Sequence, residues 1–294
     1  MKGQMIALIT DKATTVEYED PKTESGQLLA HLREKGFCVS FQIWDDKNVN
    51  WSEFDAIVMN TPWDYKEKIV EFKAWLDEVE KTGILILNPP EIIHWNSDKT
   101  YLKEMEEKGV KITPTLWFEK GEKLDVDLVF AQFKTDKIII KPQMSTNNGQ
   151  TFVLAKDEAI EKREYFERLF KENYFMIQPV LQEIDIQGEW SFVFLNGKFS
   201  HSVIKTGGKI ERIEAPLNLV ENAEKIVERF AKGCLYSRVD GLVLEGEFAL
   251  RRLEVTAPNL YLSYSNGGGM ERYSHGLAQK ILESDKKKMM DKEN

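Results

Sequence analysis

Few residues in this chain could form covalent cross-links or span a membrane. Only two cysteines, Cys38 and Cys234, occur in 294 residues, far apart and without the spacing of a metal site. No run of about 18 apolar residues is present, so no membrane span is expected. The apolar stretch after Met1 is too short for a secretion signal. We therefore expect both cysteines to be reduced core thiols in a cytoplasmic protein.

Several common catalytic motifs are also missing. The sequence contains no GxxxxGK[ST] phosphate loop, no GxGxxG fingerprint, no HExxH motif and no GxSxG nucleophile turn. The four histidines are scattered along the chain. These absences argue against a zinc enzyme, a dinucleotide-binding Rossmann protein and a serine hydrolase.

An excess of positive charge is missing as well. The 40 lysines and arginines are outnumbered by 49 aspartates and glutamates, which gives a net charge of −9. A protein of this charge is not expected to bind nucleic acid through many phosphate contacts, although a local basic pocket for one nucleotide remains compatible. The basic run at residues 286–288 is interpreted as a solvated helix end.

Alternating strands and helices are predicted from residue 5 to about residue 90. Short apolar runs alternate with helical patterns, and the pattern over residues 66–81 has the i, i+3, i+4 spacing of an amphipathic helix. This alternation predicts a small α/β domain with a parallel sheet. The strands are predicted at residues 5–10, 37–44, 55–60 and 84–88, and the helices at residues 26–35 and 66–81.

The rest of the chain is predicted to be richer in strands. One helix is expected over residues 98–108, with Ser97 or Asp98 as its cap. Asn196-Gly197 predicts a tight hairpin turn, and Asn147-Asn148-Gly149 a second hairpin. Further helices are predicted at residues 124–133, 158–171, 222–232 and around 276–283, and strands at residues 137–143, 151–155, 175–180, 189–195, 198–205, 236–244 and 249–255.

The chemistry is expected on two neighbouring strands near the end of this region. Side chains two residues apart on a strand share a face, so Arg238 lies beside Asp240, and Glu254 beside Thr256. If the strands pair, two carboxylates, a cation and a hydroxyl share one face. Mg²⁺ in proteins is typically held by one or two carboxylates together with substrate phosphates. The alternative is an ion pair on an exposed sheet face.

A phosphate-binding segment is expected around Lys141. This lysine ends an apolar run and precedes a polar loop that contains Ser145 and Gly149, whose backbone N–H groups could cover phosphates. Gln178-Pro179 follows an apolar strand and could mark a hinge beside an adenine. Taken singly, these features are also compatible with a strand end, a hairpin loop and a simple strand exit.

Together, these residues resemble the ATP-grasp superfamily, its glutathione-synthetase-like branch and, within that branch, the ATP-grasp ligases of the cycloserine-biosynthesis type. The resemblance spans nearly the whole chain and is specific as a set rather than in any one motif. The segments that carry it are Trp51-Ser52-Glu53-Phe54-Asp55, Trp63-Asp64-Tyr65, Asn88-Pro89, Trp95-Asn96-Ser97-Asp98-Lys99, Thr113-Pro114-Thr115, Gly188-Glu189-Trp190-Ser191, Phe199-Ser200-His201, Arg238-Val239-Asp240-Gly241 and Pro258-Asn259-Leu260.

The resemblance implies a mixed α/β and α+β architecture with the ATP-grasp fold. A pre-ATP-grasp domain with a parallel sheet is expected over residues 1–95. A lid or central subdomain is expected over residues 96–180. A C-terminal subdomain with an antiparallel sheet and the Mg²⁺ site is expected over residues 181–294.

The resemblance also implies the cofactors ATP and Mg²⁺ and a role for each site residue. Arg212, Arg238 and Lys205 are the expected catalytic cations, and Asp240, Glu254 and Asn259 the expected metal ligands. The residues expected to bind ATP are Lys99, Lys141, Ser145, Gly149, Gln178, Pro179, Val180 and Glu189.

Three positions depart from the pattern of the family. Thr256 stands where many members carry an asparagine that binds metal, and Ala257 stands where close relatives often have an acid. Asn60-Thr61-Pro62 precedes Trp63, where relatives often have an arginine. The first two departures concern the second metal site, and the third concerns the substrate pocket.

The expected activity is that of an ATP-dependent ligase that joins a small-molecule carboxylate to an amine or a related nucleophile through an acyl phosphate. Neither nucleic acid nor a membrane is expected as a partner, and a homodimer is common among similar ligases. Three alternatives stay open: a phosphotransferase that phosphorylates a hydroxyl, a degenerate ATP-binding protein without turnover, and an interaction protein with acidic sheets.

Overall fold

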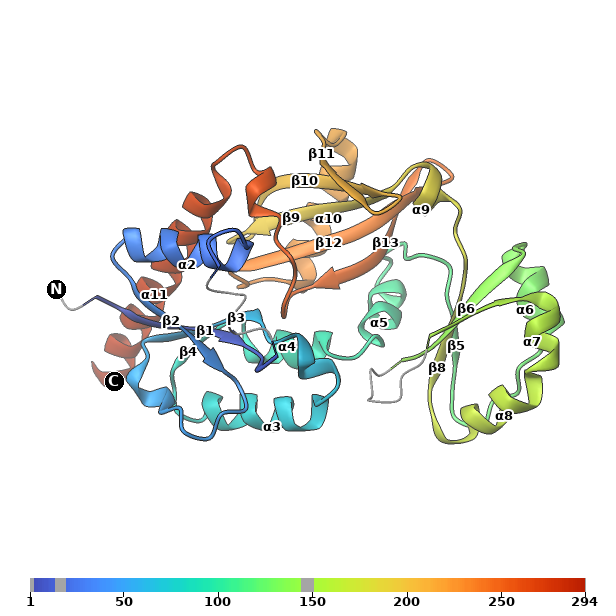
Figure 1. Cartoon of the computed structure of the whole chain (residues 1–294), viewed down its shortest axis with the longest axis horizontal. Coiled ribbons are helices and arrows are strands. Elements are labelled where there is room, and N and C mark those ends of the chain that lie inside the picture. Colours follow the sequence, from blue (N-terminus) through green and yellow to red (C-terminus); the bar gives the residue numbers. More distant parts are fainter. Residues whose placement is uncertain (1–2, 14–19, 144–150, 294) are drawn as a thin grey trace.

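Three sheets organise the molecule, one in each of three lobes (Figure 1). The computed structural model describes residues 3–13, 20–143 and 151–293. In the view of Figure 1 the first lobe lies at the left, the C-terminal sheet at the top and a smaller lid lobe at the right. None of the helices in the described ranges is both long and apolar enough to cross a membrane.

The first lobe contains a parallel sheet with the order β2-β1-β3-β4. Alternate residues of β1 face opposite sides: Ile6 and Leu8 pack toward α2, whereas Ala7 and Ile9 pack toward α3. The sheet is therefore buried on both faces, as expected for a parallel sheet. The strands are β1 (Met5–Thr10), β2 (Cys38–Ile43), β3 (Ala56–Thr61) and β4 (Leu85–Leu87), and the helices are α2 (Glu24–Glu34), η1 (Trp51–Glu53), η2 (Trp63–Lys66), α3 (Ile69–Glu80) and α4 (Pro90–Asn96).

The lid is built on a four-stranded sheet with the order β5-β8-β6-β7, in which every pair is antiparallel. Helix α6 begins where the Asp125 side chain accepts a hydrogen bond from the Leu128 amide at 3.0 Å. The strands are β5 (Leu116–Phe118), β6 (Lys137–Pro142), β7 (Phe152–Ala155) and β8 (Phe175–Pro179), and the helices are α5 (Tyr101–Glu107), which leads into the lid, α6 (Val126–Phe133), α7 (Lys156–Glu161) and α8 (Arg163–Glu172).

The third lobe is a five-stranded antiparallel sheet with the order β11-β10-β9-β12-β13. The predicted turn at Asn196-Gly197 joins β9 to β10, and both residues have the positive φ that a two-residue hairpin requires, 51° and 75°. The strands are β9 (Glu189–Leu195), β10 (Lys198–Thr206), β11 (Lys209–Arg212), β12 (Tyr236–Leu244) and β13 (Glu247–Glu254), and the helices are α9 (Glu183–Ile186), α10 (Leu217–Phe230), η3 (Leu262–Tyr264) and α11 (Gly269–Glu293).

One hydrophobic core joins the first lobe to the third. Leu28 and Leu32 of α2 pack in the same cluster as Val193 of β9 and as Leu277 and Ile281 of α11. The lid, by contrast, has a core of its own between its sheet and the helices α6 to α8. Two of the three lobes therefore form one packed body, and the lid is attached to it.

Asn88 connects these two lobes through hydrogen bonds at the end of β4. Its carboxamide oxygen accepts from the Leu235 amide at 2.7 Å, and its nitrogen donates to the Tyr236 carbonyl at 2.9 Å. The same nitrogen donates to the Val255 carbonyl. The side chain thereby fixes the first sheet against β12 and β13.

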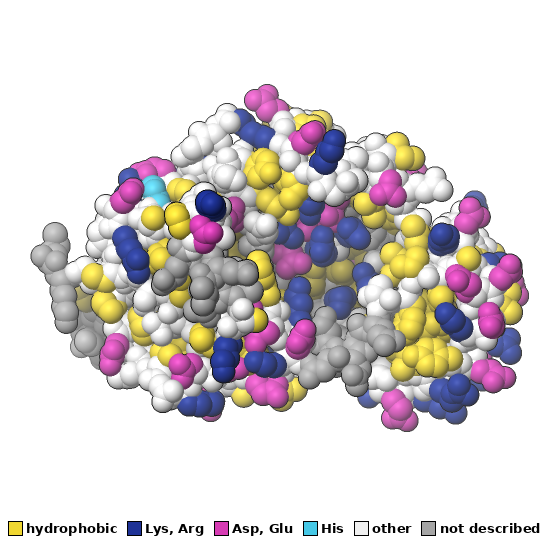
Figure 2. Space-filling model, viewed as in Figure 1, with side chains coloured by type: hydrophobic (Ala, Val, Ile, Leu, Met, Phe, Trp, Pro, Cys, Tyr) yellow, Lys and Arg dark blue, Asp and Glu magenta, His cyan; other side chains and the backbone are white. Residues whose placement is uncertain are grey.

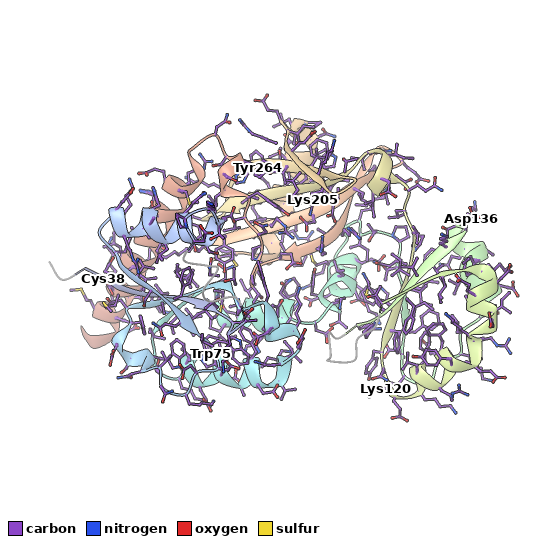
Figure 3. All side chains as sticks on the ribbon, viewed as in Figure 1. Cys38, Trp75, Lys120, Asp136, Lys205 and Tyr264 are labelled. Carbon is purple, nitrogen blue, oxygen red and sulfur yellow. The ribbon has the colours of Figure 1, made fainter. Side chains whose placement is uncertain are left out.

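Most predicted elements are present, but three predictions about local structure are wrong. The helix expected over residues 158–171 is two helices, because Lys162 leaves helical geometry between α7 and α8. The helix expected from residue 98 begins at Tyr101, because Asp98 instead accepts a hydrogen bond from the Thr100 amide at 2.9 Å in a turn. Cys38 is exposed, since it begins the edge strand β2 (Figure 3), whereas Cys234 is buried as expected.

Candidate functional site

A basic pocket lies where the three lobes meet, and Figure 2 shows Lys and Arg side chains gathered in this hollow. It encloses about 210 Å³. Five cations line it, but Glu254 is its one acidic residue among the described residues. Its lining comprises Tyr65, Lys66, Asn96, Ser97, Lys99, Tyr101, Leu102, Lys141, Arg251, Arg252, Leu253 and Glu254. Such an excess of positive charge in an acidic protein suits a polyanionic ligand.

Lys99 and Lys141 reach this pocket from the two sides of the junction between body and lid. Lys99 precedes α5, and its backbone amide donates to the Gln143 carbonyl of the lid at 3.2 Å. Burial, together with the nearby cations Lys99, Arg251 and Arg252, lowers the pKa of Lys141 to about 8. The pKa of Lys99 is also lowered, by burial and by Lys66. For both ammonium groups, burial and neighbouring cations outweigh the stabilisation of the charged form, although Asp98 and Glu254 partly offset this for Lys99.

Asp240 lies at the floor of the site, on β12, and is completely buried. Its Oδ1 accepts from Ser191 Oγ at 2.6 Å and from Arg238 Nε at 2.9 Å. Its Oδ2 accepts from Arg238 Nη2 at 2.9 Å, and Arg252 Nη2 lies 3.3 Å away. Burial alone would raise the pKa of Asp240, but Arg238, Arg252 and Lys205 outweigh it and hold the pKa well below its usual range. Asp240 is therefore a carboxylate at any physiological pH.

The Glu189 carboxylate forms ion pairs with three cations of the sheet. Lys205 Nζ lies 2.7 Å from its Oε2, and Arg251 Nη1 donates to its Oε1 at 2.6 Å. Arg252 contacts the same carboxylate at 3.2 Å, so this arginine lies between Glu189 and Asp240. Burial and Asp240 would raise the pKa of Glu189, but the three cations lower it below its usual value. Lys205 is labelled in Figure 3 on the sheet that holds this network.

Glu254 differs from the other two carboxylates because it has no ion pair and no side-chain hydrogen bond with any described residue. It lies opposite Arg238 in the β12–β13 register, while Asp240 lies opposite Arg252. Asp240 and Glu254 are thus diagonal neighbours on one face, as predicted. No group of three His, Cys, Asp or Glu side chains with metal-binding geometry exists in the described part of the chain. Two carboxylates beside a basic pocket are compatible with Mg²⁺, which in proteins often takes its other ligands from phosphates and water.

Comparisons with known proteins agree with this architecture. The family profile "D-cycloserine synthetase DcsG, N-terminal domain" matches residues 6–88. The cycloserine biosynthesis protein DcsG of Streptomyces lavendulae is 24% identical, and the alignment covers 94% of this chain and 99% of that protein. The crystal structure of D-cycloserine synthetase DcsG superposes with a TM-score of 0.79 at 23% identity, over 94% of this chain and 99% of the other.

Two further solved structures extend the likeness. D-alanine–D-alanine ligase from Bacillus anthracis, solved with ATP, gives a TM-score of 0.69 at 16% identity, over 99% of this chain and 100% of the other. A RimK domain protein of the ATP-grasp type from Sphaerobacter thermophilus gives 0.68 at 14% identity, over 93% and 98% of the two chains. The chain has the ATP-grasp fold. The predicted fold class and the predicted resemblance to ATP-grasp ligases are confirmed.

In this ATP-grasp fold, the structure brings most of the predicted site residues together. Lys99, Lys141 and Glu254 share the basic pocket, and Asp240 lies beneath it in contact with Arg238. Lys205 and Glu189 belong to the same charge network. Ser145 and Gly149 lie outside the described residues.

The predicted adenine hinge lies at the end of β8, between lid and body. Gln178 is buried, and its amide donates to Thr115 Oγ1 at 2.8 Å, so this side chain is committed to the lid. Pro179 ends β8, and the Val180 amide donates to the Lys137 carbonyl at 2.9 Å. A contact of these three residues with adenine stays a prediction.

Arg212 and Asn259 lie apart from the cluster. Arg212 is exposed on the outermost strand β11, where it pairs with Val203 of β10. Asn259 accepts a hydrogen bond from Arg238 Nη1 through its backbone carbonyl at 2.9 Å, while its side chain is exposed. The catalytic role of Arg212 and the metal role of Asn259 stay predictions.

Asn259 lines a second pocket, of about 220 Å³, between the first and third lobes. Trp63 lines it as well, together with Asn60 and Thr61 from the segment in which an arginine was expected from the family resemblance. Glu24 also borders this pocket, but its two oxygens accept from the amides of Leu260 and Leu262 at 2.9 and 2.6 Å. Apart from Glu24, the lining of the pocket is neutral and largely apolar, with Leu28, Met59, Leu260 and Leu262 among its residues.

Arg251 and Arg252 are functional candidates that the sequence analysis missed. They stand immediately before Leu253-Glu254 on β13. The rule that residues two apart on a strand share a face would have placed Arg252 beside Glu254. Arg251 also lines the pocket, which alternation alone does not predict.

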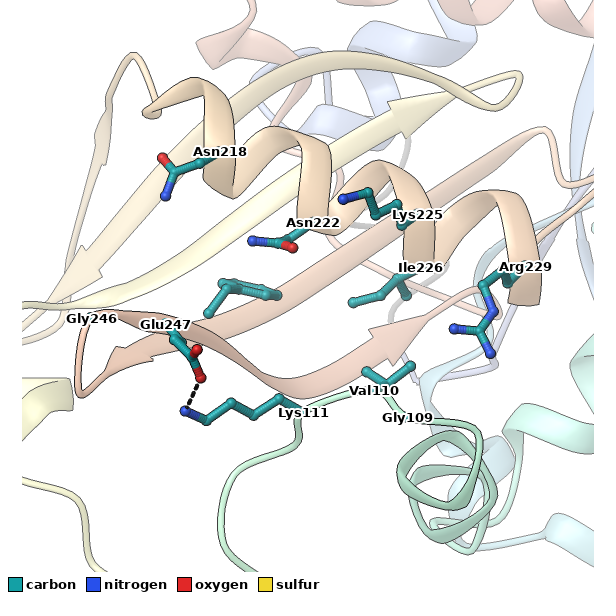
Figure 4. Close-up of a pocket in the computed structure, with 11 residues that line it drawn as sticks. Gly109, Val110, Lys111, Asn218, Asn222, Lys225, Ile226, Arg229, Gly246 and Glu247 are labelled. Atoms are coloured by element: carbon teal, nitrogen blue, oxygen red, sulfur yellow. Dashed lines mark hydrogen bonds and ion pairs between the residues drawn. The ribbon is translucent and has the colours of Figure 1, made fainter.

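A larger groove, of about 400 Å³, lies against α10 (Figure 4). Lys111 there is paired with Glu247 at 2.6 Å. Phe248 and Ile226 of this groove pack with Val239, on the face of the sheet opposite Asp240. Although this groove is larger, we do not assign the active site to it, because none of the predicted site residues line it.

Proposed function

We propose that the protein is an ATP-dependent ligase that joins a small-molecule carboxylate to an amine or a related nucleophile through an acyl phosphate. The observation that supports this proposal is the basic pocket, in which five cations face one carboxylate that has no partner among the described residues. The relatives named as a synthetase and as a D-alanine–D-alanine ligase support the same class of reaction.

The proposed reaction has two steps. A carboxylate oxygen of the first substrate attacks the γ-phosphorus of ATP, the bond to the β,γ-bridging oxygen breaks, and ADP leaves. The amine then attacks the acyl carbon, the bond to the phosphate oxygen breaks, and inorganic phosphate leaves with loss of a proton from nitrogen. Positioning and charge neutralisation dominate catalysis of phosphoryl transfer.

Each group of residues has a proposed part in this reaction. Lys99, Lys141 and the neighbouring arginines would neutralise the phosphates, and Asp240 and Glu254 would hold Mg²⁺. Bound Mg²⁺ would supply further neutralisation of the phosphate oxygens. Arg238 and Lys205 stabilise charge near the reacting carboxylate, with Arg212 in the same role if the lobes approach one another.

The pocket beside Asn60 and Trp63 is the proposed place for the small-molecule substrates. Its neutral and largely apolar lining suits an uncharged, partly apolar portion of such a molecule. We further propose that the protein acts in the cytoplasm, with a homodimer as the arrangement to be tested.

Thermal unfolding with and without ATP and Mg²⁺ tests the nucleotide site. ATP at about 100 times its dissociation constant should add about 2.7 kcal/mol, which is visible as a rise of several degrees in Tm. Glu254→Gln should leave the Tm of the free protein unchanged, because Glu254 has no partner to lose, and should reduce the metal-dependent part of the shift. Absence of any shift in the wild-type protein would remove the main support for an ATP-dependent enzyme.

Turnover assays then separate the ligase from its alternatives. A ligase should release ADP and phosphate when a suitable carboxylate is supplied, and hydroxylamine should trap the acyl phosphate as a hydroxamate. Glu254→Gln should lower the rate by on the order of 100-fold, about 3 kcal/mol of barrier. A stable phosphorylated product without free phosphate would instead indicate a phosphotransferase, and ATP binding without ADP formation would indicate a protein without turnover.

A further inference from the structure

The most notable unexplained feature of the site is that other residues of the protein already donate to most of the lone-pair positions of the Asp240 carboxylate. A carboxylate has about four lone-pair positions for donors or metals. Ser191, Arg238 Nε and Arg238 Nη2 take three of them at 2.6, 2.9 and 2.9 Å. The group that faces the remaining position, on Oδ2, is Arg252 at 3.3 Å. A metal ion that binds Asp240 must therefore replace one of these groups.

Arg252 is the group that the structure holds least tightly. Its contact with Asp240 is longer than those of Ser191 and Arg238, and its side chain is 42% exposed, against 7% for Arg238. The same nitrogen, Nη2, is shared with the two oxygens of Glu189 at 3.3 and 3.2 Å. Lys205 Nζ lies 3.8 Å from Oδ1 of Asp240, but its ion pair with Glu189 at 2.7 Å holds it away from the Oδ2 position. Arg238 is held in place by a two-point pair with Asp240 and by the Asn259 carbonyl at 2.9 Å. Ser191 is completely buried. Displacing either of those two would leave a buried polar group without a partner, which is costly.

Arg252 also has one N–H donor without a hydrogen-bond partner among the described residues, and its side chain lines a pocket that could supply another partner. Its Nε is buried and has no hydrogen-bond partner among the described residues. The side chain lines the basic pocket together with Lys99 and Lys141, where the phosphates of a nucleotide would lie. A guanidinium binds phosphate oxygens through paired N–H donors, whereas the contacts of Arg252 with Asp240 and Glu189 all use the one nitrogen Nη2, at 3.2–3.3 Å.

We infer that Arg252 is a nucleotide-dependent gate on the metal site. Without nucleotide, Arg252 occupies the remaining position on Asp240 and competes with a divalent cation. When the phosphates of a nucleotide bind, Arg252 moves from Asp240 to a phosphate oxygen, and the position on Oδ2 becomes free for the metal. Metal and nucleotide therefore bind cooperatively, and Arg252 is the positioning residue that couples them. This inference rests on the proposed function, since it assumes that the basic pocket binds a nucleotide.

The test measures Mn²⁺ binding to the full-length protein with and without ADP, using the electron paramagnetic resonance signal of free Mn²⁺. For the wild-type protein, ADP should raise the affinity for Mn²⁺ at least tenfold. In Arg252→Gln the affinity without ADP should rise several-fold, because Asp240 loses its competitor, and the ratio of the two affinities should fall toward one. Arg252→Lys, which keeps a cation, should retain most of the ratio.

Arg251→Gln is the matched control. Arg251 is bonded to Glu189 at 2.6 Å, and no contact with Asp240 is observed for it. This variant should keep the wild-type ratio even if the affinity for ADP falls. An unchanged Mn²⁺ affinity and ratio in Arg252→Gln, in a protein that still binds ADP, would overturn the gate alone. Failure of the wild-type protein to bind ADP or ATP at all would overturn the proposed function and the gate with it.

Discussion

At the scale of single residues, the site is defined by charges that are not balanced within the protein. Lys141 is the clearest example, because its pKa of about 8 results first from burial and then from three neighbouring cations. Glu254 is the complementary example, a carboxylate near the same cations without an ion pair among the described residues. Both groups would become balanced only when phosphate and metal arrive.

The depressed pKa of Lys141 predicts a pH dependence of ATP binding. The lysine is charged below pH 8 and increasingly neutral above it, whereas bound phosphates favour the charged form. ATP binding should therefore take up a proton above pH 8, and the affinity should be level below pH 8 and fall above it, by up to about tenfold per unit. Calorimetry at pH 8.5 in two buffers with different ionisation enthalpies measures this uptake.

Lys141→Arg supplies the control for this measurement. A guanidinium stays charged over the whole range, so the variant should lose most of the proton uptake and most of the decline above pH 8. Equal uptake in the two proteins would mean that another group titrates. Lys99, whose pKa is also lowered, is the group to test next by the corresponding Lys99→Arg variant.

The residue scale also shows what sequence reasoning could and could not reach. The pairing of Arg238 with Asp240, and the diagonal position of Glu254, followed from the two-residue period of strands. The same rule would have found Arg252, which was not considered. The pairing of Lys205 with Glu189 is consistent with the predicted hairpin, in which the two residues are opposite each other. The other two partners of Glu189 could not be predicted, because Arg251 and Arg252 come from β13, more than 60 residues away.

At the scale of elements, a few side chains that form hydrogen bonds between lobes fix the sheets relative to one another. Asn88 is the best example, with hydrogen bonds to the backbone around Leu235, Tyr236 and Val255. The motif Asn88-Pro89 was noticed in the sequence, but only as part of a family resemblance. Its structural role was not predictable, since its partners lie about 150 residues away in the chain.

Asn88→Ala should destabilise the body by about 2–4 kcal/mol. The substitution leaves a buried N–H and two buried carbonyls without their partner, and each such group costs about 1–3 kcal/mol, partly relieved by relaxation. Urea unfolding monitored by tryptophan fluorescence measures the change. Asn48→Ala, at an exposed turn where the side chain bonds only to Asp46, should change the free energy of unfolding by less than about 0.5 kcal/mol. Similar values for the two variants would contradict this role of Asn88.

The existence and type of most elements were predictable, while several boundaries were not. The amphipathic pattern over residues 66–81 identified α3, and Asn196-Gly197 identified a hairpin. The start of α5 was misplaced because Asp98 can either cap a helix or close a turn, and the sequence does not distinguish the two. The short edge strand β5, with three residues, carries too little periodicity to be recognised.

At the scale of the whole molecule, the chain divides into a two-lobe body and a lid with a separate core. Phe170 is completely buried in the lid and stacks on Phe175 with ring centroids 4.5 Å apart. The three-lobe division was expected from the family resemblance, and the boundaries at residues 95 and 180 stay predictions. A common core between the first and third lobes was not expected.

Phe170→Ala should therefore destabilise the lid without loosening the body. Removing a buried phenylalanine costs about 3–5 kcal/mol. Hydrogen–deuterium exchange followed by mass spectrometry should show faster exchange in β6 and β8 and unchanged exchange in β1 and β9. Tyr174→Ala, at an exposed lid position, is the control and should change neither region. Equally fast exchange in body and lid of the Phe170 variant would show that the two unfold together.

The position of α11 has a consequence for the synthesis of the protein. Its residues Leu277 and Ile281 complete the core that covers α2 in the first lobe. About 240 residues separate α2 from Leu277. A ribosome makes about 5–20 residues per second, so the apolar face of α2 waits on the order of 10–50 seconds for α11. During this interval Leu28 and Leu32 lack part of their native covering. Until α11 has been synthesised, this apolar surface is open to non-native contacts.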